Sequence, residues 1–80
     1  MSKTIKQIII NKEPVELFKI LKFEGLTSTG GEAKLLIGDG QVMVNHEVET
    51  RKSRKMVSGD TLKFAGEVYK LKFEPEVDLD

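Results

Sequence analysis

The chain contains no cysteine, which excludes disulfides and thiolate metal sites and fits a reducing compartment. Long apolar runs are also missing. The longest is Ile8-Ile9-Ile10, far shorter than a membrane span. The first seven residues lack the apolar stretch of a signal peptide. We therefore expect a cytoplasmic protein without a membrane segment.

The chain is short, with 80 residues, which is enough for one domain. A domain of this size buries roughly 60% of the surface that its unfolded chain exposes, so its core is thin. It has little room for both a core and an enclosed catalytic pocket. We therefore expect a monomeric binding module and not an enzyme, with no cofactor.

Positive charge is unevenly distributed along the chain, although 13 basic and 13 acidic residues balance overall. The last seven residues, 74–80, contain four acids and no base. Residues 1–73 therefore hold 13 bases against 9 acids, a net charge of +4. We expect one folded domain over residues 1–73 and a frayed acidic tail over residues 74–80.

The first half of the chain alternates strand and helix signals. β-Branched residues dominate positions 4–10, which predicts a strand. Pro14 suits the first turn of a helix, and Gly25 is placed to end that helix in a left-handed conformation. A second helix is predicted to start near Thr29, with Ser28 or Thr29 as its N-cap, because Glu32 follows Thr29 at capping-box spacing. It should end between residues 38 and 40.

The second half predicts strands. Residues 41–44 and 47–50 flank Asn45-His46, a hairpin signal whose second turn position would favour glycine. Residues 61–64 and 68–73 alternate in polarity and form a second strand pair. The element order indicates an α+β fold in which two helices pack on a small β-sheet with an extra N-terminal strand.

We interpret Glu47 and Glu49 as a solvent-facing strand edge. The four phenylalanines are interpreted as core residues: Phe18, Phe23, Phe64 and Phe73.

From Leu17 to Leu62 the chain resembles the ribosomal-protein S-four type RNA-binding domain, or αL motif. The matching residues are Leu17, Leu21, Gly25-Leu26, Thr29 to Lys34, Ile37, Gly40 to Asn45 and Gly59-Asp60. Small stand-alone bacterial members are the nearer match, because they share Thr-Gly-Gly-Glu-Ala-Lys at the second helix and Glu-Thr-Arg after the hairpin. The chain departs from the wider family at Val15-Glu16-Leu17, where an Arg-Leu-Asp string is usual, and at His46, which replaces the hairpin glycine.

The first candidate site is a run of four cations within five residues, namely Arg51, Lys52, Arg54 and Lys55. Such a run is often only a solvated loop. The forked guanidinium of arginine and the ammonium of lysine also bind phosphate oxygens, and the resemblance favours contact with RNA.

Lys34 and Lys22 are further candidates for contact with RNA. Lys34 lies near a helix start, where the helix dipole disfavours a cation. A residue in an electrostatically unfavourable position is a candidate for a functional role.

The segment Thr29-Gly30-Gly31 is a candidate phosphate-binding site, because a helix start presents free N–H groups. The alternative is ordinary capping by Thr29. The segment lacks the spacing of a nucleotide-binding loop. The single histidine, His46, has neither a nucleophile nor further ligands nearby in the sequence pattern, so we expect an exposed turn residue and no metal site.

The resemblance implies non-catalytic binding of structured RNA, with ribosomal RNA, the ribosome or its assembly intermediates as candidate partners. Contact would be made through phosphates on a basic surface patch. The alternative is a protein-interaction module that docks an acidic partner surface through the same basic loop. In that case the edge strand at residues 4–10 would also be available for pairing.

Overall fold

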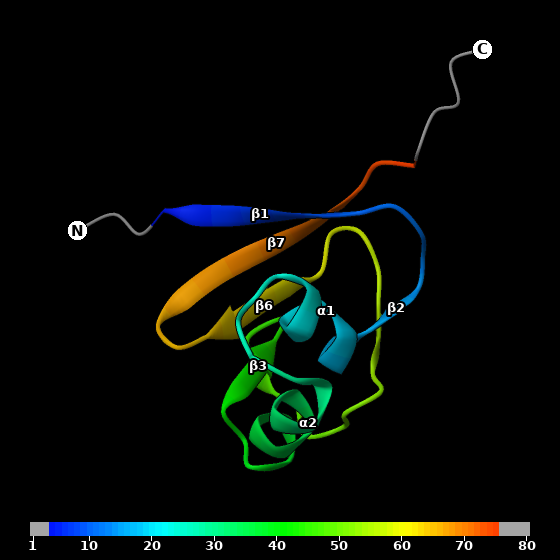
Figure 1. Cartoon of the computed structure of the whole chain (residues 1–80). Coiled ribbons are helices and arrows are strands. Elements are labelled where there is room, and N and C mark those ends of the chain that lie inside the picture. The colour runs from blue at the N-terminus through cyan, green and yellow to red at the C-terminus, as the bar shows by residue number, and fades with distance from the viewer. Residues whose placement is uncertain (1–3, 76–80) are drawn as a thin grey trace.

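The structure is a computed structural model that describes residues 4–75 (Figure 1). Five strands form a mixed sheet in the order β1-β7-β6-β3-β4. The strands are β1 (Ile5–Ile10), β7 (Glu67–Phe73), β6 (Thr61–Phe64), β3 (Val42–Val44) and β4 (Glu47–Val48). β1 runs parallel to β7, and the other pairs are antiparallel. The predicted tail beyond residue 75 lies outside the described residues.

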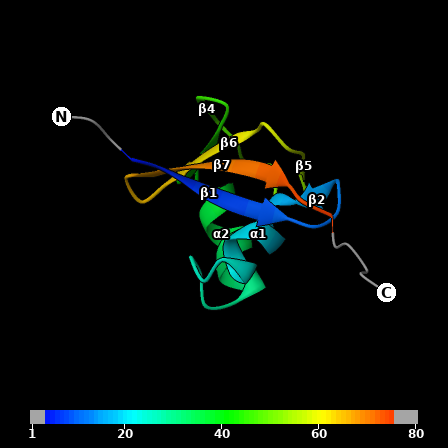
Figure 2. The ribbon, with the colours of Figure 1, turned by 90° about the horizontal axis from the view of Figure 1, so that it is seen from above.

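Both helices, α1 (Leu17–Phe23) and α2 (Gly30–Gly38), lie on one side of this sheet, as Figure 2 shows. Strand side chains alternate between faces, so every second residue of β1, β6 and β7 points toward the helices. The core members are Ile8, Ile10, Leu17, Ile20, Leu21, Ala33, Ile37, Val42, Val44, Met56, Leu62, Tyr69 and Leu71. The predicted α+β fold is confirmed. Neither helix is long and apolar enough to cross a membrane.

The first helix begins at Leu17, so the prediction of a start at Pro14 was wrong. Residues Val15–Glu16 form a short strand, β2, which pairs antiparallel with β5 (Lys55–Met56). Glu16 is extended, with φ −72° and ψ 139°, so the backbone before Leu17 belongs to a ladder and not to a helical turn. This second sheet was not predicted, because two-residue strands carry no periodic signal.

The helix ends follow the predictions. Gly25 has φ +72°, and the N–H groups of Gly25 and Leu26 donate to the carbonyls of Lys22 and Leu21. This is a Schellman motif, in which a left-handed glycine satisfies the last free carbonyls of the helix. At the start of α2, the Thr29 hydroxyl accepts the Glu32 N–H at 3.0 Å, as predicted.

The Asn45-His46 hairpin is confirmed, with φ of 51° and 72° at the two turn residues. Asn45 also fastens the turn to β6, because its side-chain oxygen accepts the Thr61 N–H at 2.9 Å. Its amide nitrogen donates to Asp60 at 3.1 Å. Asn45 and Asp60 are therefore hydrogen-bond partners. Both belong to strings that carry the family resemblance, Gly40 to Asn45 and Gly59-Asp60.

Phe23 does not belong to the core, contrary to the prediction. Its exposed fraction is 69%, whereas Phe18, Phe64 and Phe73 are partly buried against the core. In α1 the buried positions are Leu17, Ile20 and Leu21, and Phe23 lies outside this stripe. An aromatic residue at the end of a short helix was assigned to the core from its type alone.

Candidate nucleic-acid interface

The basic loop, residues 51–55, is anchored to the start of α1. The N–H of Leu17 donates to the carbonyl of Arg54 at 2.9 Å, and the N–H of Phe18 donates to the carbonyl of Lys52 at 3.2 Å. The first N–H groups of a helix have no partner within the helix, so these two bonds cap α1 from outside. The loop is thus held in a defined position and is not merely a solvated run.

Glu49 binds both arginines of the loop. Its carboxylate accepts from the Arg51 side chain twice at 3.0 Å, from the Arg51 N–H at 2.9 Å and from Arg54 at 2.8 Å. Only 7% of Glu49 is exposed, so its interpretation as a solvent-facing residue was wrong. β4 ends at Val48, and the strand alternation that would place Glu49 beside Glu47 stops there.

The arginines hold the pKa of Glu49 at about 2, well below its ordinary value. Hydrogen bonds from the Arg51 side chain are the largest cause, and they outweigh the burial that opposes ionisation. The three side chains together therefore carry a net charge of +1. The Arg51 side chain is 73% exposed and can still meet a ligand, whereas that of Arg54 is 28% exposed.

Lys52 joins the loop to the far end of α2. Its Cε lies 3.6 Å from the position that a Cβ on Gly38 would occupy. A cation beside a helix C-terminus is favoured by the helix dipole. Because the Lys52 carbonyl also caps α1, this one residue contacts both helices.

Lys34 contacts the ring of Phe18, and the Lys22 side chain lies near Gly30 at the start of α2. The Lys34 ammonium lies 4.5 Å from the ring centre, and the Lys19 ammonium lies 5.9 Å from it. A Cβ on Gly30 would lie 3.7 Å from the ring and 3.9 Å from the Lys22 side chain. The cation–π contact gives Lys34 a local partner, which offsets its unfavourable place near the start of α2.

Lys55 borders the same region through Glu16, its partner in the β2–β5 ladder. The pKa of Glu16 is lowered, mainly by a hydrogen bond from Lys19 and then by one from Ser53, with a smaller electrostatic effect of Lys55. The Lys19–Glu16 ion pair has an N–O distance of 3.0 Å. Lys19 was missed in the sequence analysis, because a single lysine on the outer side of a helix carries no distinctive signal.

Phe18 links α1 to both α2 and the basic loop. Its N–H binds the basic loop, and its ring lies under Lys34 and close to Gly30. Contacts of Phe18 and Lys52 therefore connect α1, α2 and the loop, the three elements that carry the six predicted cations. We call these six residues the basic surface: Lys22, Lys34, Arg51, Lys52, Arg54 and Lys55. A shallow hollow in it is lined by Arg51, Ser53, Arg54 and Lys55.

The segment Thr29-Gly30-Gly31 lies beside Phe18 at the start of α2. Thr29 acts as the N-cap, and the Glu32 carboxylate accepts the N–H of Ser28 at 2.7 Å. A phosphate at this helix start would meet the like charge of Glu32. Ordinary N-capping therefore accounts for Thr29, and phosphate binding at this helix start stays a prediction.

Among residues 4–75, no group of three or more histidine, cysteine, aspartate or glutamate side chains could hold a metal ion. His46 is an exposed residue of the hairpin turn. The chemistry that the described site offers is therefore the binding of anions by fixed cations.

Known proteins similar to the chain include members of one family. The model of the S4 domain matches residues 8–72. A curated relative named "Putative RNA-binding protein YbcJ", from Escherichia coli K12, is 50% identical over 58 residues, which cover 71% of this chain and 83% of the relative. Another, "Probable ribosome maturation protein RlbA" from Bacillus subtilis 168, is 34% identical over 59 residues, covering 74% and 83% respectively.

The solution structure of Escherichia coli YbcJ has a similar fold, with a TM-score of 0.65 and 40% sequence identity. The match covers 90% of this chain and 92% of the other. That structure is described as an αL motif involved in RNA binding. The names of these relatives refer to RNA binding and ribosome maturation and not to catalysis.

Proposed function

The chain belongs to the S4 domain family, and we propose that it binds RNA without catalysing a reaction on it. The proposal is supported by the family match over residues 8–72 and by the 50% identical relative whose name refers to RNA binding. It is also supported by the geometry, because the Phe18 ring lies under Lys34 of α2 and the Phe18 N–H binds the carbonyl of Lys52 in the basic loop.

Within this function, we assign RNA contact to the basic surface. The observation that carries the assignment is the double role of Phe18, whose backbone holds the loop and whose ring holds Lys34. Cations fixed on rigid elements lose little conformational freedom on binding, so more of their attraction for phosphate appears as affinity.

The basic surface is better suited to recognising the shape of a structured RNA than to reading a particular base sequence. The groove edges of A-form RNA are hidden from side chains or offer little sequence information, so proteins recognise such helices by shape and phosphate position. Lysine and arginine side chains spread over two helices and a loop can follow the phosphates of a folded RNA. The relative named for ribosome maturation supports ribosomal RNA, in the ribosome or its assembly intermediates, as the partner.

The ion pairs of Glu49 set the expected salt dependence. Arg51 and Arg54 share one carboxylate, so together they contribute about one net charge, in addition to four lysines. About four to five displaced counterions correspond to a slope of log K against log salt of roughly −3 to −4.

The test is titration of a stable RNA hairpin at several salt concentrations with the double variant Lys34→Ala/Lys52→Ala. Each lost phosphate contact should make the slope shallower by about 0.7–0.9 and weaken binding. The matched control is Lys63→Ala/Lys70→Ala. It removes the same charge from exposed strand positions whose neighbours Leu62, Tyr69 and Leu71 point to the core. Equal losses in both variants would show that net charge, and not this surface, governs binding.

The alternative of an acidic protein partner predicts a different result from the same experiment. Such a partner would use the basic loop but would leave the wild-type chain without RNA affinity at low salt. RNA-induced amide shifts centred on residues 18, 34 and 51–55 would support the RNA proposal, and an unchanged spectrum at low salt would support the protein partner.

A further inference from the structure

Strand β1 is the edge of the five-stranded sheet, and its second side is unpaired within residues 4–75. The strand is six residues long and contains four isoleucines. Ile5 and Ile9, on its outward face, are 60% and 46% exposed. Proteins usually protect such an edge with proline, a bulge or several charges, because unpaired strand groups readily pair with another chain. Lys6 is the one charged residue in β1.

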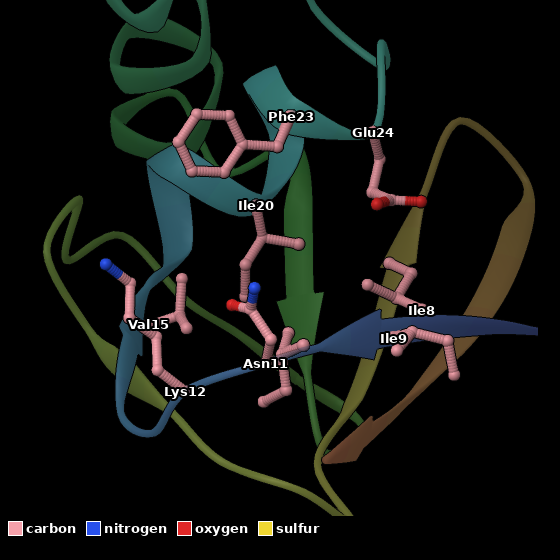
Figure 3. A pocket seen from close by; sticks show the side chains of 9 residues that line it. Ile8, Ile9, Asn11, Lys12, Val15, Ile20, Phe23 and Glu24 are labelled. Carbon is pink, nitrogen blue, oxygen red and sulfur yellow. The ribbon is translucent and has the colours of Figure 1, made fainter. Parts of the chain in front are cut away.

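A groove of about 250 Å³ runs along this edge (Figure 3). Its lining includes Ile8, Ile9 and Ile10. Successive strand side chains point to opposite faces, so three consecutive residues can line one groove only along the edge of the strand. The opposite wall comes from α1, with Ile20 and the exposed Phe23. The groove therefore combines an open backbone edge with an apolar wall.

The two ends of the groove carry opposite charges. Lys12 lies at the end where β1 finishes, and Glu24 lies at the other end, where α1 finishes (Figure 3). Neither residue takes part in the ion pairs found among residues 4–75. An occupant that matches this groove would place an anion near Lys12 and a cation near Glu24.

We propose that the occupant is a second copy of this chain, paired through β1 in antiparallel orientation about a two-fold axis near the middle of the groove. Such an axis reverses the ends of the groove, so Lys12 of each copy faces Glu24 of the other. A two-fold interface must be complementary to itself, and a groove with opposite charges at its ends meets that condition. Phe23 of each copy would then be covered in the joined groove.

This dimer leaves the basic surface open. Phe18 and Phe23 are five residues apart in α1, about 140° around the helix, so they lie on different flanks. Pairing through the Phe23 flank therefore yields a particle with two accessible basic surfaces. The inference departs from the expected monomer and does not depend on the proposed RNA binding.

The association should be weak. A six-residue edge and one small groove lie at the low end of specific interfaces, so we expect a dissociation constant of about 10–500 μM. Sedimentation equilibrium of the full chain between about 10 μM and 1 mM would measure it. The wild-type chain should shift from monomer to dimer within that range.

Charge reversal tests the arrangement. Lys12→Glu and Glu24→Lys alone should each weaken dimerisation about tenfold, because every reversal places two like-charged pairs across the axis. The double variant Lys12→Glu/Glu24→Lys should restore the wild-type constant to within about threefold. Lys63→Glu is the matched control on another strand and should leave dimerisation unchanged. Amide spectra of each variant verify that the fold is retained.

Two outcomes would overturn the proposal. The first is a wild-type chain that stays monomeric up to 1 mM. The second is a double variant that dimerises as poorly as the single ones. No RNA is present in these measurements, so their failure would leave the RNA proposal standing.

Discussion

Glu49 and Arg51 are joined by three hydrogen bonds of 2.9–3.0 Å, two from the guanidinium and one from the backbone N–H. The same carboxylate binds Arg54 at 2.8 Å. Part of the positive charge of the basic loop is therefore used to hold the loop in shape. A preorganised loop loses less conformational entropy when a ligand binds, so the acid can support the binding of an anion that it would repel by charge alone.

Replacing Glu49 with glutamine should destabilise the fold. The variant keeps the size of the side chain but loses the charge that the two arginines share, and one guanidinium is largely buried. We expect the free energy of unfolding to fall by about 1–3 kcal/mol in urea denaturation. Glu47→Gln is the matched control, because Glu47 is exposed, and it should stay within about 0.5 kcal/mol of wild type. Equal effects of the two substitutions would rule out a structural role of the Glu49 pairs.

The stability that Glu49 provides should depend on pH in the acid range. Its pKa in the folded protein is lowered to about 2 from 4.5, so the contribution is complete above pH 4.5 and is lost as the pH falls toward 2. The difference in unfolding free energy between wild type and Glu49→Gln should therefore shrink over that interval. Urea denaturation of both proteins at several pH values between 6 and 2.5 measures this difference. A difference that does not change with pH would contradict the low pKa.

Phe18→Leu should separate positioning from charge at the basic surface. The substitution keeps an apolar side chain but removes the ring face that holds Lys34, a contact worth about 0.5–1 kcal/mol at exposed sites. RNA affinity should fall about two- to fivefold, while the slope of log K against log salt stays unchanged because no cation is lost. Lys34→Ala should instead make the slope shallower. A change of slope in Phe18→Leu would show that the ring does more than hold Lys34.

His46→Gly should stabilise the hairpin. His46 has φ 72°, a conformation that costs a residue with a side chain about 1–2 kcal/mol and costs glycine almost nothing. The greater freedom of glycine in the unfolded chain offsets part of this, so we expect a gain of about 0.5–1 kcal/mol in urea denaturation. Asn45→Gly is the control at the same turn. It also has positive φ, but it should lose stability because the Asn45 side chain binds Thr61 and Asp60.

Much of the fold could be predicted because local chemistry determines it. Glycine at positions 25 and 40 ends helices in left-handed conformations, and Asn45-His46 and Ala65-Gly66 turn the chain with positive φ. The alternating polarity of residues 61–64 and 68–73 predicted two strands, which are β6 and β7 in the structure. These features depend on neighbours within a few residues, so the sequence alone contains them.

The errors have one physical origin, which is contact between residues distant in the chain. Residues 15–16 are strand because they pair with residues 55–56 about forty positions later. Glu49 is buried because β4 ends before it and the loop arginines fold back onto it. Phe23 is exposed because no described element covers the flank of α1 beside β1.

By itself, the sequence determined the element order, the turns and the choice of cations, because each of these follows from residue type and short-range spacing. The tertiary structure decided which charges are paired, which elements contact one another and which strand edge stays open. These depend on packing: one residue, Phe18, contacts both α2 and the basic loop, and one carboxylate, Glu49, determines how much of the positive charge is left for a ligand.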